Sequence, residues 1–186
     1  MTSQTEFLDK LVPGYQGVAQ KWECDNMGHL NVSHYFGRSS DQAFFTRHAL
    51  GIDPAALRDG GHGTVALEEH CRFHREVTSG DMMVGRSAVI EPRERTMVVY
   101  QEFRDAKEAL QTSFRTVIGF FDTKARRLMP WPEATREKAA NLTINLPDYA
   151  APLRVPAGGA IGQISREVSI AEGFFRSGAT GVNSWE

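Results

Sequence analysis

Residues 22–50, WECDNMGHLNVSHYFGRSSDQAFFTRHAL, join a polar loop to the segment that we expect to form the principal helix. No proline occurs from Asn31 to about Leu50, and aromatic and apolar residues recur there at spacings typical of a helix. Gly51 then provides a helix stop. Small residues in the helix favour close approach of its backbone to another surface: Gly37, Ser39 and Ser40. This stretch therefore predicts a long helix buried against a sheet.

Most of the remaining sequence up to residue 122 has the pattern of strands. Residues 15–22 predict a strand that leads into the polar loop, and two short polar segments further on suit hairpin turns. Later strands are expected at residues 67–77, 82–90, 96–103 and 110–121, followed by a short helix at 133–140. Four consecutive strands after one helix predict an antiparallel sheet in an α+β domain.

The composition is that of an ordinary soluble globular domain. The 186 residues include 41% hydrophobic and 24% charged side chains, with a formal net charge of −2. This balance gives no support for nucleic acid or an anionic membrane as the main partner. No apolar stretch reaches the roughly 20 residues that cross a bilayer, and the N-terminal residues lack the features of a secretory signal. With only two cysteines, we expect a reduced, cytoplasmic protein.

A change in composition near residue 141 predicts a domain boundary. Residues 1–140 form the expected domain, whereas residues 141–186 combine proline- and glycine-rich linker chemistry with a C-terminal extension. Residues 181–186, GVNSWE, resemble residues 17–23, GVAQKWE, with one residue fewer. This similarity is either chance or the start of a second copy of the domain.

The loop before the long helix carries the densest cluster of polar groups. Asp25 lies close to the predicted helix start, where the first backbone N–H groups have no partner within the helix. A carboxylate beside such N–H groups offers a base or nucleophile together with an oxyanion site for a reacting carbonyl. The alternative is structural: Asp25 or Asn31 caps the helix, and Gly28 makes a turn.

Two motifs carry a family resemblance. The pattern Asp-x-x-Gly-His-x-Asn-x-x-x-Tyr spans residues 25–35, and Arg75-Glu-Val-x-x-Gly80-Asp81 opens the series of hairpin strands. Together they resemble the 4-hydroxybenzoyl-CoA thioesterase branch of the HotDog superfamily over residues 15–138. The resemblance implies an α+β HotDog fold, in which a curved antiparallel β-sheet wraps a long central helix. It also implies a homodimer or higher homo-oligomer, because active sites in this fold usually lie between two protomers or two repeats.

The resemblance assigns roles to individual residues. Asp25 matches the catalytic aspartate, as nucleophile or general base, and N–H groups at the helix start match the oxyanion donors. His29 and Asn31 fit the pattern Asp-x-Asn-x-His-x-Asn of acyl-carrier-protein thioesterases, although Met27 replaces its first asparagine. His29 either polarises the thioester or holds the loop. The candidate residues are, for catalysis, Asp25, Gly28, His29 and Asn31, and, for substrate binding, Val32, Ser33, Tyr35 and Glu69.

Glu69 departs from the alternation of its strand, because it falls on the apolar face. It either reaches an active-site cleft or marks a β-bulge. In the same strand, His70 and His74 would lie about 13 Å apart, too far to share one metal ion, so no metal site is predicted. The aromatic residues near the motif could line an acyl pocket, but we expect most of them in the core: Trp22, Tyr35, Phe36, Phe44 and Phe45.

The sequence analysis therefore points to a thioesterase that hydrolyses an acyl-CoA or an acyl-carrier-protein thioester to a free acid and a thiol. It implies no cofactor other than coenzyme A as part of the substrate. Basic residues in turns either meet the coenzyme A phosphates or are solvated: Arg93, Arg95, Lys124, Arg126 and Arg127. Two alternatives stay open, a non-catalytic acyl-CoA-binding module and an acyl-CoA hydratase or dehydratase, for which no matching Asp and His arrangement is found.

Overall fold

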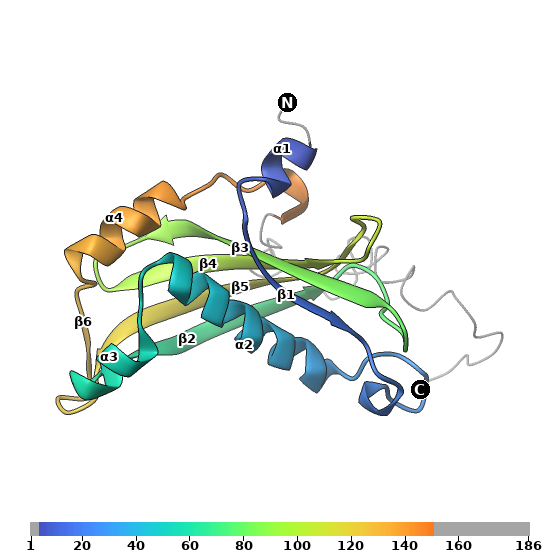
Figure 1. Cartoon of the computed structure of the whole chain (residues 1–186), viewed down its shortest axis with the longest axis horizontal. Helices are drawn as coiled ribbons and strands as arrows, with labels where there is room; N and C mark the ends of the chain where they lie inside the picture. Colours follow the sequence, from blue (N-terminus) through green and yellow to red (C-terminus); the bar gives the residue numbers. More distant parts are fainter. Residues whose placement is uncertain (1–3, 151–186) are drawn as a thin grey trace, which may run out of the picture.

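One antiparallel sheet and a long helix make up the body of the chain, as the computed structural model shows for residues 4–150, with side chains described from Glu6 onward (Figure 1). In chain order the elements are α1 (Gln4–Leu8), β1 (Val12–Val18), the 3-10 helix η1 (Lys21–Glu23), α2 (Val32–Ala49), α3 (Pro54–Asp59), β2 (His62–Phe73), β3 (Met82–Pro92), β4 (Thr96–Arg104), β5 (Leu110–Asp122), β6 (Arg127–Met129), α4 (Glu133–Asn141) and the 3-10 helix η2 (Asp148–Ala150).

The long helix α2 begins and ends close to the predicted positions. Asn31 caps its N-terminus, since the Asn31 Oδ1 accepts a hydrogen bond from the Ser33 N–H at 3.1 Å. At the other end, Leu50 follows the last helical turn, and Gly51 takes a φ of +71°, a conformation that favours glycine. The prediction of a principal helix over this stretch is confirmed.

The predicted strands are present, but their ends differ. β1 starts and ends earlier than the expected 15–22, since residues 21 and 22 belong to η1. β2 starts and ends earlier than the expected 67–77, whereas β3, β4 and β5 extend the expected strands by one or two residues. The strand order is β1-β3-β4-β5-β2, all neighbours are antiparallel, and β6 pairs with β5. The α+β prediction is therefore confirmed. The short elements α1, α3 and β6 do not follow from the sequence pattern.

Polar contacts hold α2 against one face of the sheet, which curves around it (Figure 1). Gln42 on α2 is fully buried. Its Oε1 accepts a hydrogen bond from the Tyr15 N–H at 2.8 Å, and its Nε2 donates to Ser87 Oγ at 3.0 Å. Gly14 in β1 leaves room for this amide, because a Cβ there would lie 2.3 Å from the Gln42 Oε1. The polar residues of the helix thus bind it directly to β1 and β3.

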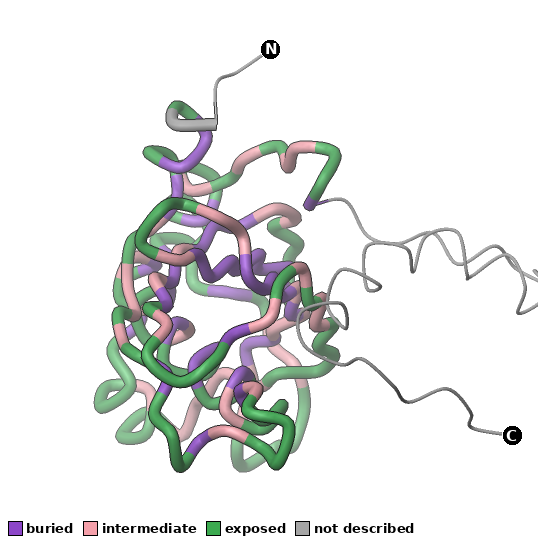
Figure 2. The backbone as a smooth tube through the Cα atoms, turned by 90° about the vertical axis from the view of Figure 1, so that its right-hand side faces the viewer, coloured by how far each residue is buried: buried purple, intermediate pink, exposed green. Residues whose placement is uncertain are grey.

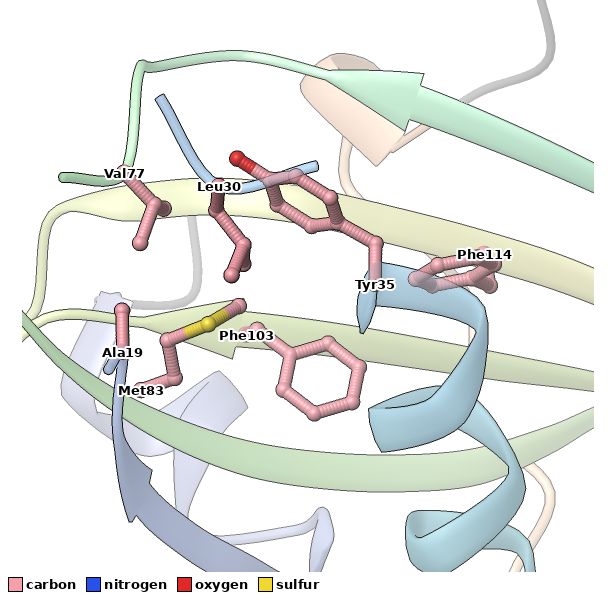
Figure 3. Packing of buried hydrophobic residues seen from close by; sticks show 7 residues of the cluster. All are labelled: Ala19, Leu30, Tyr35, Val77, Met83, Phe103 and Phe114. Carbon is pink, nitrogen blue, oxygen red and sulfur yellow. The ribbon is translucent and has the colours of Figure 1, made fainter. Parts of the chain in front are cut away.

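Apolar clusters lie at both ends of α2. The first joins its N-terminal half to the sheet and is drawn in Figure 3: Ala19, Leu30, Tyr35, Val77, Met83, Phe103 and Phe114. Phe103 on β4 and Phe114 on β5 meet edge to face, with ring centroids 6.0 Å apart. The second cluster joins the C-terminal end of α2 to α4: Leu50, Ile52, Val89, Met97, Phe120, Trp131 and Ala139.

The opposite face of the sheet is covered by α1 and by residues 142–150. Tyr100 of β4 packs there in an apolar cluster with residues of both segments. Beside it the buried Glu102 accepts hydrogen bonds from the Arg104 Nε at 2.5 Å and the Tyr149 hydroxyl at 3.3 Å. Figure 2 shows buried residues gathered in the interior of the body. The first part of the predicted linker therefore packs against the sheet.

The rest of the predicted C-terminal extension, residues 151–186, lies outside the described residues. The expected similarity of residues 181–186 to residues 17–23 falls within it and stays a prediction.

The core assignment predicts the cost of a large-to-small substitution. Phe103→Ala should lower the free energy of unfolding by about 3–5 kcal/mol, because it leaves a cavity where several rings meet. Urea denaturation followed by circular dichroism measures this loss. Phe45→Ala makes the same change at a side chain that is 46% exposed and should cost less than about 1 kcal/mol. Equal losses in the two variants would show that the core is assigned wrongly.

Candidate active site

Asp25 lies in a tight loop directly before α2. Its Oδ1 accepts hydrogen bonds from the Met27 N–H at 2.9 Å and from the His29 N–H at 3.1 Å. Gly28 takes a φ of +85°, which a residue with a side chain rarely adopts, and its N–H donates to the Asp25 carbonyl at 3.1 Å. The side chain is exposed, and within residues 4–150 its Oδ2 accepts no hydrogen bond. One carboxylate oxygen is therefore fixed, and the other is available for chemistry.

Backbone hydrogen bonds fix this loop on both sides. The Asp25 N–H donates to the His29 carbonyl at 2.8 Å, which closes the loop upon itself. The Leu30 N–H donates to the Val77 carbonyl at 2.7 Å, and the Asn31 N–H donates to the Glu23 carbonyl at 2.9 Å. The position of Asp25 is thus set by the segment between β2 and β3 as well as by its own turn.

A buried ion pair ties the loop to the helix. The Arg38 guanidinium on α2 lies 2.6 Å from Glu23 Oε2, and the same oxygen accepts the Gln20 N–H at 2.8 Å. Burial raises the pKa of Glu23, but the hydrogen bonds from Arg38 and Gln20 and the charge of Arg38 outweigh it, so the pKa lies below its ordinary 4.5. Glu23 is therefore a buried, paired carboxylate at neutral pH.

The start of α2 is capped, so not all of its first N–H groups are free to bind a reacting carbonyl. Asn31 Oδ1 accepts both the N–H and the hydroxyl of Ser33, the latter at 2.9 Å, and the Asn31 carbonyl accepts the His34 N–H. The Ser33 N–H is thus already used, and Asn31 has the structural role that the sequence left open. The cap does not use the N–H of Val32, the first residue of α2.

His29 and Tyr35 have different surroundings. The His29 Nε2 lies 3.5 Å from Glu76 Oε2, a contact that supports its loop-holding role. Tyr35 is 2% exposed and packs edge to face on Phe73 with ring centroids 5.1 Å apart. Figure 3 shows its ring among core side chains. The expectation that Tyr35 contacts substrate is therefore not supported, because it points inward from α2 into the core.

A cavity of about 160 Å³ lies between the C-terminal half of α2 and strands β2, β4 and β5. Glu69 lines it, and its Oε1 accepts the Ser39 hydroxyl at 2.8 Å and the Thr116 hydroxyl at 3.2 Å. The β2–β5 pairing also shifts register between Ala66 and Glu68. The bulge therefore lies next to Glu69 rather than at it, and the carboxylate lines the cavity; that this cavity is the active-site cleft stays a prediction.

Two further polar side chains line the cavity, although the sequence analysis did not predict them as site residues. Gln101 on β4 is 2% exposed, and Arg47 on α2 is half-buried. Within the described part of the chain, the Gln101 Oε1 and the Arg47 Nε are buried without a hydrogen-bond partner. No short motif marks either residue. A buried glutamine in the middle of an apolar strand is the one signal that points to Gln101.

The cavity and the Asp25 loop lie at different places along α2. The cavity involves the helix from Ser39 to Arg47, whereas Asp25 precedes the helix start at Val32. At about 1.5 Å per residue, the middle of the cavity lies roughly 16 Å along the helix from its first turn. The structure thus groups Asp25, Gly28, His29 and Asn31 together, and places Glu69 apart from them.

Most of the aromatic residues near the motif are exposed, contrary to expectation. The exposed fractions are 74% for Trp22, 56% for Phe44, 46% for Phe45 and 38% for Phe36. Helical spacing alone cannot tell a core face from an unpartnered one. Leu67 on the outer strand β2 is also 48% exposed, and β2 pairs with β5 on one side only in the described sheet. Exposed apolar side chains therefore lie on both α2 and the outer strand β2.

His70 lies within β2 and His74 follows its last residue, and the two side chains have different surroundings. The His70 Nε2 lies 2.5 Å from Glu68 Oε1 in solvent, whereas the His74 Nε2 lies 2.9 Å from Ser113 Oγ. Burial, and then the charges of Arg72 and Arg104, lower the pKa of His74 to about 4. Among residues 4–150, no three His, Cys, Asp or Glu side chains are arranged to hold a metal ion.

In the same range of residues, none of the helices has the length and apolar character needed to cross a membrane.

The basic turns gather at one end of the sheet. The turn between β3 and β4 contacts the segment after β6, because the Trp131 N–H donates to the Glu94 carbonyl at 2.9 Å. Arg93 pairs with Glu91 at 2.6 Å. Whether these turns meet the phosphates of a ligand stays a prediction.

Comparisons with known proteins agree with this fold. A family model described as the thioesterase-like superfamily matches residues 18–139. A Staphylococcus aureus protein solved in complex with CoA is similar, with a TM-score of 0.69 and 16% identity over 78% of this chain and 96% of that one. A gentisyl-coenzyme A thioesterase has a TM-score of 0.60 and 16% identity over 67% of this chain and 98% of its own. No curated protein matches.

A third solved structure is a 1,4-dihydroxy-2-naphthoyl-CoA thioesterase from Synechocystis. It has a TM-score of 0.62 and 11% identity over 70% of this chain and 96% of its own. At these identities the likeness shows the fold, in which a long helix lies on a curved antiparallel sheet.

The Glu23–Arg38 pair predicts a pH dependence of stability. Because the folded-state pKa of Glu23 is lowered, its charge stabilises the fold above about pH 4.5, and this stabilisation is lost as the pH falls through the folded-state pKa. The stability gap between wild type and Glu23→Gln should therefore be largest near neutral pH and shrink below about pH 4.5. Urea denaturation at a series of pH values measures the gap. A gap that stays constant or widens with acid would contradict the assignment.

Proposed function

Because the chain belongs to the thioesterase-like superfamily, whose model matches residues 18–139, we propose that it hydrolyses an acyl-CoA thioester to a free acid and coenzyme A. The observation that carries this proposal is the fixed Asp25 carboxylate, with one free oxygen, directly before the first turn of α2. The similar structure solved in complex with CoA supports coenzyme A, rather than a carrier protein, as the thiol.

Asp25 acts in one of two ways in this proposal. As a general base it takes a proton from water while the water oxygen attacks the thioester carbonyl. As a nucleophile its Oδ2 attacks the carbonyl carbon itself, and water then hydrolyses the resulting anhydride. In both routes the C–S bond breaks, the sulfur leaves as the coenzyme A thiol, and the acyl group ends as a carboxylic acid.

The start of α2 supplies the electrostatic part of the mechanism. The carbonyl oxygen gains negative charge as the tetrahedral intermediate forms. The Val32 N–H, which the Asn31 cap leaves over, and the positive end of the helix dipole stabilise that charge. Glu23 and Arg38 hold this first turn in register with the Asp25 loop.

A homodimer completes the site in this proposal. The middle of the cavity lies roughly 16 Å along α2 from its first turn, and this separation supports a site that a second copy completes. In the described sheet one edge of β2 has no partner strand, and the exposed Phe36, Phe44 and Leu67 lie on α2 and β2, two of the elements that line that cavity. A second copy packed there by two-fold symmetry covers these side chains and brings its own loop to the cavity of the first.

The alternative function is binding of acyl-CoA without hydrolysis. It would retain the cavity and the fold but not the turnover. Measured release of thiol separates the two, since a binding module gives saturable binding with hydrolysis no faster than the uncatalysed reaction.

Asp25→Asn should reduce kcat/KM for acyl-CoA hydrolysis by about a hundredfold or more, because the amide is neither a base nor a comparable nucleophile. Release of free thiol from a panel of acyl-CoA esters measures it. Asp9→Asn, an exposed aspartate on another part of the chain, should leave the rate unchanged. A fully active and folded Asp25→Asn would exclude the proposed role.

Mixing two inactive variants tests the shared site. Ala43→Phe fills the cavity, and Asp25→Asn removes the carboxylate, so each homodimer is inactive. After unfolding and refolding together, mixed dimers contain one intact site and should restore about a quarter of the wild-type activity by random pairing. No recovery, with both variants folded and the mixed dimer detected by mass spectrometry, would place the complete site within one chain.

A further inference from the structure

Glu69 is a carboxylate with one oxygen held and one oxygen available. Its Oε1 accepts the Ser39 hydroxyl at 2.8 Å and the Thr116 hydroxyl at 3.2 Å. Both hydroxyl residues are buried, with exposed fractions of 3% for Ser39 and 7% for Thr116, whereas Glu69 itself is exposed. Within residues 4–150 the Glu69 Oε2 accepts no hydrogen bond. The fold thus fixes this side chain through one oxygen and leaves the other open to a ligand or to water.

Gln101 provides a second polar group in the same cavity. It is 2% exposed, and its Oε1 has no hydrogen-bond partner among the described residues. One water occupies about 30 Å³ in the liquid, so the cavity of about 160 Å³ has room for water, and its polar walls offer the partners that a bound water needs. A water between the two side chains donates one hydrogen to the Glu69 Oε2 and the other to the Gln101 Oε1.

The nucleophilic route of the proposed function needs a base other than Asp25. In that route the Asp25 Oδ2 attacks the thioester carbonyl, the C–S bond breaks, and the sulfur leaves as thiolate and takes a proton from solvent. Asp25 is then part of an anhydride and cannot take a proton from water. The N–H groups of Met27 and His29 at its Oδ1 stabilise the carboxylate as the leaving group of the next step. A separate carboxylate is required to activate the water by general-base catalysis.

We propose that Glu69 is the general base of the second step, that Gln101 positions the attacking water, and that Asp25 is the nucleophile of the first step. The inference rests on the proposed thioesterase function with its shared site, in which Asp25 comes from the second copy. It adds a catalytic residue and an order of events to that function.

The second step balances as follows from these roles. Glu69 takes a proton from the water, the water oxygen attacks the acyl carbonyl, and the bond from that carbonyl carbon to the Asp25 oxygen breaks. The products are the carboxylic acid and the free Asp25 carboxylate, and Glu69 returns its proton to solvent.

Pre-steady-state kinetics of Glu69→Gln test this order of events. Acetyl-CoA, octanoyl-CoA and benzoyl-CoA are the probes, and the ester with the highest wild-type kcat/KM is used. Because the first step is intact in Glu69→Gln, mixing should release about one thiol per site in a burst, followed by turnover about a hundredfold or more slower than wild type. Intact mass spectrometry of the quenched protein should show one added acyl group. The double variant Asp25→Asn/Glu69→Gln should show neither the burst nor the acyl group.

Two control variants match the two residues. Glu68→Gln should keep the wild-type time course, because Glu68 precedes Glu69 in β2 but is 62% exposed, pairs with His70 and does not line the cavity. Gln101→Met keeps the size of the side chain and removes the amide oxygen, so it should show the same burst with turnover at least about tenfold slower than wild type. Gln111→Met should behave as wild type, since Gln111 is equally buried with an unpartnered Oε1 but lies outside the cavity lining.

The variants are compared after circular dichroism has shown that they fold. Glu69→Gln keeps an oxygen that accepts the Ser39 and Thr116 hydroxyls. Wild-type turnover in Glu69→Gln, slow turnover without a burst or an added acyl group, or the same slow course in Glu68→Gln overturns the inference. If Glu69→Gln does not fold, Gln101→Met decides: a burst followed by slow turnover supports the inference, and its absence overturns it.

The wild-type protein tests the thioesterase proposal separately. No hydrolysis of any of the three esters overturns that proposal and this inference with it. Wild-type hydrolysis without a burst in the folded Glu69→Gln variant overturns this inference alone, and the thioesterase proposal then stands with Asp25 as the general base.

Discussion

The buried contact between Arg38 and Glu23 is the constraint on which the candidate site depends. Arg38 belongs to α2 and Glu23 ends η1, directly before the Asp25 loop, so the pair fixes the direction in which the chain enters the helix. Removing either partner would leave a charge in a place that excludes water. The Asp25 turn, the Asn31 cap and the first free N–H of the helix all lie within this short stretch, and they keep their mutual positions because both of its ends are held.

The same helix serves two purposes along its length. Its N-terminal half packs Tyr35 into an apolar cluster, whereas its C-terminal half presents small and polar residues to the sheet. Small residues such as Ser39 and Ala43 leave space above β4 and β5, and Gln42 and Thr46 bind the helix on the side of β3. The cavity is thus a product of how this helix is attached to the sheet.

The local features of the site follow from the sequence, and the long-range ones do not. The Asp25 turn, Gly28 and the Asn31 cap depend on neighbouring residues, so the motif at 25–35 and the helix after it could be predicted. The later strands along the chain and the family could be predicted too, but not the order of the strands in the sheet. Gln101 and Arg47 line the same cavity as Glu69 only because strands far apart in the chain pair and α2 packs on them. The exposure of Phe44 depends on what packs against α2, which periodicity cannot show.

Residues 142–150 cover the outer face of the sheet, so the folding unit extends beyond α4. Glu102 carries its charge in a fully buried position and relies on Arg104 and on the hydroxyl of Tyr149. A chain that stopped at the end of α4 would uncover Tyr100 and open this charge pair to solvent at the centre of the sheet. The segment after α4 therefore belongs to the folding unit, which extends at least as far as Ala150.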